Sequence, residues 1–327
     1  MSMKTTTTTK EKSLDDSIDL NLKLHRASKK GNLEAVEDLL VWKANVNTRN
    51  DVKWTPLHQA SFYGHLNVVG CLIKHRAKVN AREKGNYTSL HFASMNGYTD
   101  VVKCLINNRA ELYAREESNA TALHFASMKG YTDIVKCLIS NGADFNARDE
   151  CNSTALHLAS MNGHTDVVKC LINNGADSNA REENYSTPLH LASMHGHFEV
   201  VDWLIKKQAN IDAIDKDNYS SLHLASMNGH TDVVKCLLFN GAALNIKDKD
   251  NWTPLHMASK CGHHNIVVYL IEYGAKVNAK TIDNLTPQLL ALREGHFNVV
   301  ELLKNSEDPG KFCKGLLYFF KNCDISG

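Results

Sequence analysis

The chain is 327 residues long and nearly neutral, with 37 Lys and Arg, 36 Asp and Glu and a formal net charge of +1. Because a protein that neutralises many phosphates needs a basic face, this balance argues against nucleic acid as a partner. No run of 18 apolar residues occurs, so we expect no transmembrane helix. The N-terminus lacks the apolar core of a signal peptide, which predicts a cytoplasmic protein.

Residues 1–19 contain a run of threonines and few apolar side chains. A segment of this composition cannot bury enough apolar surface to offset the entropy lost on ordering. The sequence therefore predicts a disordered tail at this end of the chain.

From residue 20 to residue 305 the chain repeats every 33 residues without insertion or deletion. One repeated position holds the histidines His25, His58, His91, His124, His157, His190, His223 and His256. Another holds the glycines Gly31, Gly64, Gly97, Gly130, Gly163, Gly196, Gly229, Gly262 and Gly295. A fixed period of this length is the signature of stacked repeats that share one continuous core. We therefore expect nine units in one elongated domain.

The copy at residues 153–185 shows the elements that each unit is expected to contain. Thr154 caps a short helix, and His157 can bond back to it, as Glu or Gln does in a capping box. Gly163 then ends this helix in a left-handed conformation. Thr165 is expected to cap a second, longer helix with one apolar stripe, after which a polar loop projects between units.

An Asn recurs two residues before the cap of the short helix. Asn tolerates positive φ, so a tight turn is predicted at each copy. These residues are Asn86, Asn119, Asn152, Asn218, Asn251 and Asn284.

These repeats resemble the ankyrin repeat family over about residues 20–305. The matching motifs are WTPLHQAS (54–61), STPLHLAS (186–193), WTPLHMAS (252–259), GADFNA (142–147) and GAKVNA (274–279). The resemblance implies an all-α solenoid of helix-turn-helix units with β-hairpin-like finger loops. It also implies that the chain binds other proteins on its concave side, through the finger tips and short helices, and has no catalytic residues.

The cysteines do not indicate a metal site or disulfides. One repeat position holds Cys71, Cys104, Cys137, Cys170 and Cys236, and in other units Trp203, Tyr269 and Leu302. Such a mixture marks an apolar packing site, and copies about 8–10 Å apart are too distant for a disulfide. No Cys-x-x-Cys pair or ligand set accompanies the cysteines or the histidines. We expect no catalytic residue, no cofactor and no metal.

A methionine recurs near the end of the short helix in five consecutive units. The residues are Met95, Met128, Met161, Met194 and Met227. Methionine suits adaptable binding surfaces, so this ladder is a candidate partner-binding surface. The alternative is that the side chains fill gaps between neighbouring units.

Aromatic side chains recur just before the helix cap and at one short-helix end. They are Trp54, Tyr87, Tyr219 and Trp252, with Phe62 and Tyr63 in the second unit. Aromatic residues are favoured anchors of protein interfaces. The alternative is that each ring packs on the neighbouring finger.

A charged strip lies between these aromatic ends. It consists of residues 115–117, 148–150 and 181–183, with a net charge of −3 from three arginines and six acids. The strip could select a basic partner segment. It is equally explained as a solvated face.

The C-terminal tail, residues 306–327, contains an apolar stretch from Phe312 to Phe320 flanked by lysines. It is expected to form a short helix that caps the last repeat. Contact with a membrane surface or a partner is the alternative.

The sequence thus predicts a monomeric, non-enzymatic scaffold that binds one or more proteins on a concave surface. An adaptor in a larger machine, such as a ubiquitin-ligase receptor or a pathogen effector delivered into a host cell, is the second reading. A small-molecule sensor is the third.

Overall fold

The computed structural model describes residues 19–306, which form two compact units that divide at Ala155. Each of these two units contains several of the 33-residue repeats, and from here on "first unit" and "second unit" refer to them. Within these residues there is no β-strand, and the one extended pairing is an isolated antiparallel bridge between Ile214 and Ser220. The prediction of an all-α fold is confirmed. The tails predicted at residues 1–19 and 306–327 lie, apart from their inner ends, outside the described residues.

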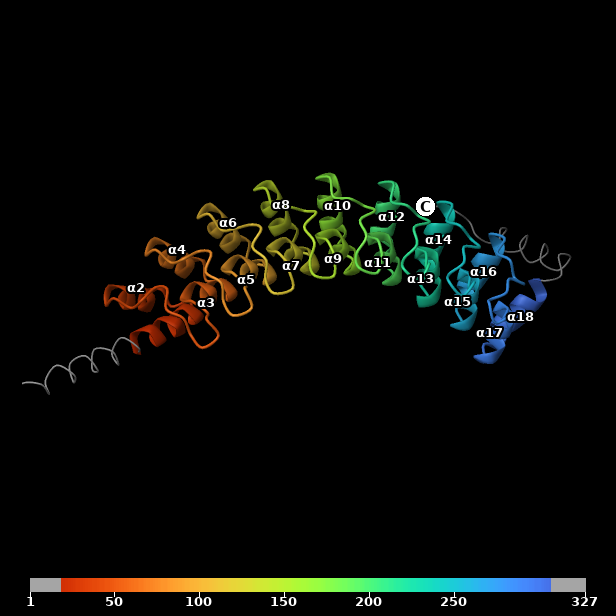
Figure 1. Ribbon diagram of the computed structural model, residues 1–327, viewed down its shortest axis with the longest axis horizontal. Helices are drawn as coiled ribbons and strands as arrows, with labels where there is room; N and C mark the ends of the chain where they lie inside the picture. Colours follow the sequence, from red (N-terminus) through yellow and green to blue (C-terminus); the bar gives the residue numbers. More distant parts are fainter. Residues whose placement is uncertain (1–18, 307–327) are drawn as a thin grey trace, which may run out of the picture. The chain divides into compact units, whose positions relative to one another are not determined.

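In the first unit, a helical segment at residues 19–30 and helix α2 (Leu33–Val41) precede three helix pairs. The pairs are α3 (Pro56–Phe62) with α4 (Leu66–Lys74), α5 (Ser89–Met95) with α6 (Thr99–Asn107), and α7 (Ala122–Lys129) with α8 (Thr132–Ser140). The short helices α3, α5 and α7 pack in one row, and α2, α4, α6 and α8 pack in a second (Figure 1).

The second unit continues the same pattern. Its pairs are α9 (Ala155–Met161) with α10 (Thr165–Asn173), α11 (Pro188–Met194) with α12 (Phe198–Lys206), α13 (Ser221–Asn228) with α14 (Thr231–Phe239), α15 (Pro254–Lys260) with α16 (His264–Glu272), and α17 (Pro287–Arg293) with α18 (Phe297–Ser306). Helices α11, α13, α15 and α17 pack in one row, and α10, α12, α14, α16 and α18 in the other.

The predicted capping box starts most of the short helices. At α3 the Thr55 hydroxyl accepts from the backbone N–H of His58, and the Thr55 backbone N–H donates to His58 Nδ1 at 2.9 Å. The same reciprocal pair is present at α5, α7, α11, α13 and α15. Two backbone donors that a helix start leaves without partners are satisfied in this way.

From His58 to His256, the second nitrogen of the repeat histidine joins one helix pair to the next. His58 Nε2 lies 2.9 Å from the Ala81 carbonyl oxygen, and His223 Nε2 lies 3.1 Å from that of Trp252. Since Nδ1 accepts a backbone N–H and Nε2 faces a carbonyl, the ring must be the neutral tautomer with its proton on Nε2. Each of these imidazoles therefore bridges its own helix start and the following finger loop, whereas both ring nitrogens of His25 lack a hydrogen-bond partner among the described residues.

A second ring makes a further bridge between pairs. It stands at the N-cap of the long helix, where His230 Nε2 lies 2.9 Å from the Met194 carbonyl oxygen of the preceding pair. The repeat glycine makes room for this ring, because a Cβ on Gly196 would lie 2.5 Å from His230 Nδ1. Gly196 also has a φ of +75°, which an L side chain rarely adopts.

One predicted cap was wrong, and one predicted turn was confirmed. Helix α10 has His164 at its N-cap, so Thr165 lies in the first turn and does not cap it. Gly163 has positive φ, and the turn at this glycine places the next residue, His164, at the N-cap of α10. All six predicted Asn turn residues have positive φ, between 58° and 64°.

Protonation of the repeat histidines should destabilise the fold. Burial lowers the pKa of His58, His91 and His223 from 6.5 to about 4, an effect only partly offset by their hydrogen bonds to backbone carbonyls. Between these pH values the unfolded chain binds protons that the folded chain does not, so stability falls as the pH falls from 6.5 to 4. Each of the three should contribute a loss of about 3 kcal/mol across this range.

Urea titrations at pH 8, 6.5, 5.5 and 4.5 would measure this loss. We expect nearly constant stability between pH 8 and 6.5 and a steep decrease below. A free energy of unfolding that stays constant down to pH 4.5 would contradict the bridging role of neutral imidazole.

A buried serine recurs three residues after the repeat histidine, and its hydroxyl lacks a hydrogen-bond partner. The hydroxyls concerned are those of Ser28, Ser61, Ser94, Ser127, Ser160, Ser193, Ser226 and Ser259, and each side chain is fully buried. Since an unpaired buried hydroxyl is costly, Ser127→Ala should raise the free energy of unfolding by about 1 kcal/mol. Chemical denaturation would measure it. Ser140→Ala is the matched control, because the exposed Ser140 hydroxyl donates to the Cys137 carbonyl, and it should not stabilise.

Candidate functional site

The finger loops are closed by acidic side chains that turn inward onto their own backbone. Glu116 is only 5% exposed and accepts the backbone N–H groups of Ser118 and Ala120, each at 3.0 Å. Asp248 does the same for Asp250 and Trp252 in the second unit. Glu83, Asp149, Glu182 and Asp215 do the same in other loops, whereas Asn50 and Thr281 take this position in the loops before α3 and α17.

Arginines then link successive fingers in the first unit. Arg49 Nη1 donates to the Arg82 carbonyl at 3.1 Å, and Arg82 Nη1 donates to the Arg115 carbonyl at 3.1 Å. Arg115 continues the series to the Arg148 carbonyl. These arginines carry their charge on the finger edge while they fix the spacing of the loops.

These bonds bear on the charged strip predicted from the sequence. Glu116, Asp149 and Glu182 each accept backbone N–H groups of their own loop. The neighbouring Glu117, Glu150 and Glu183 remain exposed. Three of the six carboxylates of the strip therefore stabilise their own loops.

Six aromatic rings of the first unit form one contiguous group, which we call the aromatic cluster. Its members are Trp54, Phe62, Tyr63, Tyr87, Phe92 and Phe125. The Trp54 centroid lies 4.5 Å from that of Phe92 and 5.3 Å from that of Phe62. Tyr87 stacks on Phe92 at 5.5 Å and lies 5.7 Å from Phe125, and Phe62 meets Tyr63 at 5.0 Å.

The cluster arises because rings from fingers and short helices alternate along it. Trp54 and Tyr87 come from the loops before α3 and α5, and Phe92 and Phe125 come from α5 and α7. Each loop ring reaches the short helix of the next pair. Four members of the cluster were predicted from the sequence, whereas Phe92 and Phe125 were not. In the other repeats this position holds Arg26, Gln59, Met257 or a leucine, so an alignment of the repeats would have revealed both phenylalanines.

Acidic groups surround one edge of the cluster. Burial, followed by the charge of Glu116, a hydrogen bond to it and the charges of Glu83 and Glu117, raises the pKa of the Tyr87 hydroxyl. At the other edge, Lys29 Nζ lies 5.4 Å from the centre of the Tyr63 ring, which is 38% exposed. The cluster therefore has an acidic end and a basic end.

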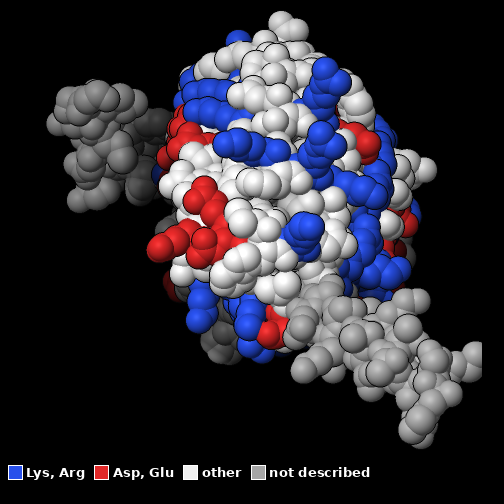
Figure 2. Space-filling model, turned by 90° about the vertical axis from the view of Figure 1, so that its left-hand side faces the viewer, with Lys and Arg blue, Asp and Glu red and all other residues white. Residues whose placement is uncertain are grey.

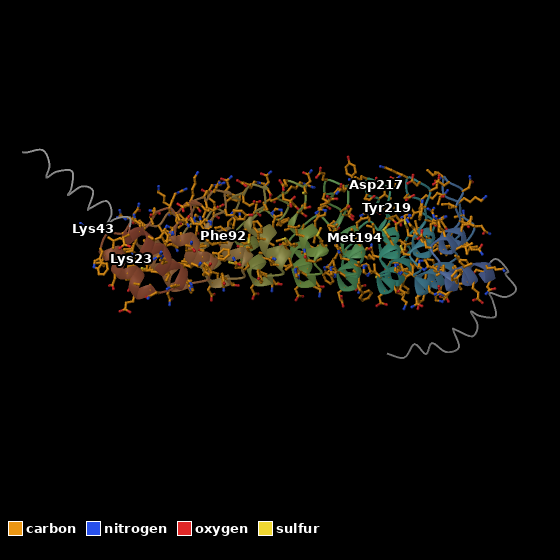
Figure 3. All side chains as sticks on the ribbon, turned by 90° about the horizontal axis from the view of Figure 1, so that it is seen from below. Lys23, Lys43, Phe92, Met194, Asp217 and Tyr219 are labelled. Carbon is orange, nitrogen blue, oxygen red and sulfur yellow. The ribbon has the colours of Figure 1, made fainter. Side chains whose placement is uncertain are left out.

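The aromatic residues predicted in the second unit are not joined in this way. Tyr219 and Trp252 each contact the histidine of their own capping box. Lys260 Nζ stands 5.1 Å from the centre of the Trp252 ring. Tyr219 follows Asp217 by two residues in the same finger loop, and Figure 3 labels both. Burial, followed by the charges of Asp248 and other nearby aspartates, raises the pKa of the Tyr219 hydroxyl.

The predicted methionine ladder lies along the short helices of both units. Met95 and Met128 of the first unit and Met194 and Met227 of the second are half-buried, and Met161 is 36% exposed. In the first unit Phe62 holds the same repeat position as the methionines. This row therefore joins the aromatic cluster to the methionines of that unit.

The repeated residues that build these elements match a family model described as ankyrin repeats, at residues 24–116, 86–149, 123–217 and 222–313. The chain belongs to the ankyrin repeat family. Ankyrin repeats are generally protein–protein interaction modules without catalytic function. A search of curated proteins found no match.

None of the helices within residues 19–306 is long and apolar enough to cross a membrane. In the same range no group of three or more His, Cys, Asp or Glu side chains is arranged to hold a metal ion.

If the aromatic cluster is one packed body, its members should be energetically coupled. Trp54→Ala and Phe92→Ala should each destabilise the chain, and the double variant should lose about 1 kcal/mol less than the sum. Urea denaturation of the four proteins would measure this coupling. The pair Trp54→Ala and Tyr113→Ala is the control, because Tyr113 is 70% exposed and outside the cluster, so its effects should add. Strict additivity for Trp54 and Phe92 would contradict the contact.

Proposed function

We propose that this ankyrin repeat protein is a non-enzymatic, monomeric scaffold that binds partner proteins on the face formed by its short helices and finger loops. The aromatic cluster is the main anchor in the first unit. The methionines of the ladder, with Tyr219 and Trp252 in the second unit, are the other proposed contact residues. No nucleic acid partner is proposed, because the chain carries almost no net charge.

The observation that carries this proposal is the aromatic cluster itself. Large rings held by neighbours on both sides lose little conformational freedom on binding, which makes them effective anchors. Phe62 is half-buried and Tyr63 is 38% exposed, so both remain available at the surface. The methionine row beside them supplies a polarizable surface that can adapt to a partner.

Packing and binding are separable at Tyr63. Its ring lies at the edge of the cluster, so its removal should disturb the fold less than removal of Trp54 or Tyr87. We expect Tyr63→Ala to weaken partner binding by about 2 kcal/mol with little change in the thermal midpoint.

A photo-crosslinking amino acid at position 63, in the full chain expressed in its native cell, would test the surface directly. We expect discrete crosslinked proteins that are lost when Trp54→Ala is added. Position 113 is the matched control, since Tyr113 is an exposed finger tyrosine of the same unit. Equal crosslinking from positions 63 and 113, or none from 63, would show that the cluster does not bind a partner.

A further inference from the structure

In the last helix pair, α17 and α18, two exposed positions of α17 are apolar, whereas the same positions of the preceding pair are polar. Leu289 and Leu292 are 46% and 50% exposed. One repeat earlier the same positions hold His256 and Ser259, both completely buried. Two polar residues of the repeat are thus replaced by leucine in the one pair that has no described pair after it.

These positions face the place that a following pair would occupy. His256 Nε2 lies 3.1 Å from the Ala279 carbonyl oxygen and 3.3 Å from that of Leu285, both in the loop that leads to α17. Val267 is fully buried in α16, whereas its equivalent Val300 in α18 is only half-buried. The open side of α17 and α18 is therefore a repeat interface without its second half.

A terminal repeat that faces water requires a polar outer side. The first unit meets this requirement, because Lys23, Arg26, Lys30 and Glu34 are exposed at its outer end, where Figure 2 shows charges of both signs. In the last pair, by contrast, two positions that are polar in the preceding pair are leucines. A surface of this kind indicates that something covers it.

We propose that residues 312–320 of this chain cover the outer face of α17 and α18. This stretch reads FCKGLLYFF and begins six residues after Ser306, where α18 ends. Six residues span up to about 20 Å, which is enough to reach either helix of the last pair. No other part of the chain beyond α18 is comparably apolar.

Charge complementarity supports the same occupant. Lysines stand at positions 311, 314 and 321, within and beside the stretch. Glu301 of α18 is exposed, and its repeat position faces the following pair, as shown by Lys235, whose Nζ lies 4.6 Å from the centre of the Tyr269 ring. A carboxylate on the open face would thus meet a segment that carries lysines.

Hydrogen exchange on the full chain tests this proposal through a double-mutant cycle. One variant is Leu292→Ser, which restores the interior residue, and the other combines Leu316→Ser with Phe319→Ser. We expect each to speed exchange of the α17 and α18 amides at least tenfold. Because both remove the same contact, the combined variant should exchange hardly faster than either alone.

Phe239→Ser is the control for loss of an exposed apolar side chain, since Phe239 is 82% exposed on α14, and it should leave α17 and α18 unchanged. Unchanged exchange in the Leu316/Phe319 variant would overturn the proposal, as would multiplicative effects of the two variants. Protection of α17 and α18 that rises with protein concentration would instead assign the face to a second copy. Protection gained only with anionic phospholipid vesicles would assign it to a membrane.

Discussion

The structure depends on a neutral imidazole that satisfies two neighbours at once. In His58, Nδ1 accepts the backbone N–H of the residue that caps its own helix, and Nε2 donates to a carbonyl of the next finger. The carbonyl lies 23 or 29 residues further along the chain in every described case. An insertion or deletion between the two would move the acceptor, which gives a physical reason for the constant 33-residue period.

A second row of contacts sets the spacing at the other end of the short helices. Histidine rings at the N-caps of long helices, such as His230 and His263, bond to carbonyls of the preceding pair, and a glycine leaves room for each of these rings. Arginine and acid side chains then fix the finger loops in the first unit. The two ends of each short helix are thus held by separate sets of bonds, so the face between them is free to vary in sequence.

Much of this architecture follows from the sequence alone. The period predicts the stacked helix pairs, the Thr and His spacing predicts the capping box, and Asn at one position predicts the positive φ. The cap at Thr165 was predicted wrongly, because its residue type fits a cap and only the backbone shows that the turn at Gly163 makes His164 the N-cap. The aromatic cluster was predicted in part, because the contact between Trp54 and Phe92 joins positions 38 residues apart that belong to different repeats. The exposure of Leu289 and Leu292 could not be predicted from the sequence either, because it depends on which elements lie beside α17.

The stack of helix pairs depends on the protonation state of the repeat histidines, which nuclear magnetic resonance can observe directly. In the full chain labelled with 15N at histidine, at pH 6, the repeat histidines should show the neutral tautomer protonated on Nε2, with an Nε2 proton that exchanges slowly with water. Imidazolium rings, or neutral rings protonated on Nδ1, would contradict the bridge on which the stack depends.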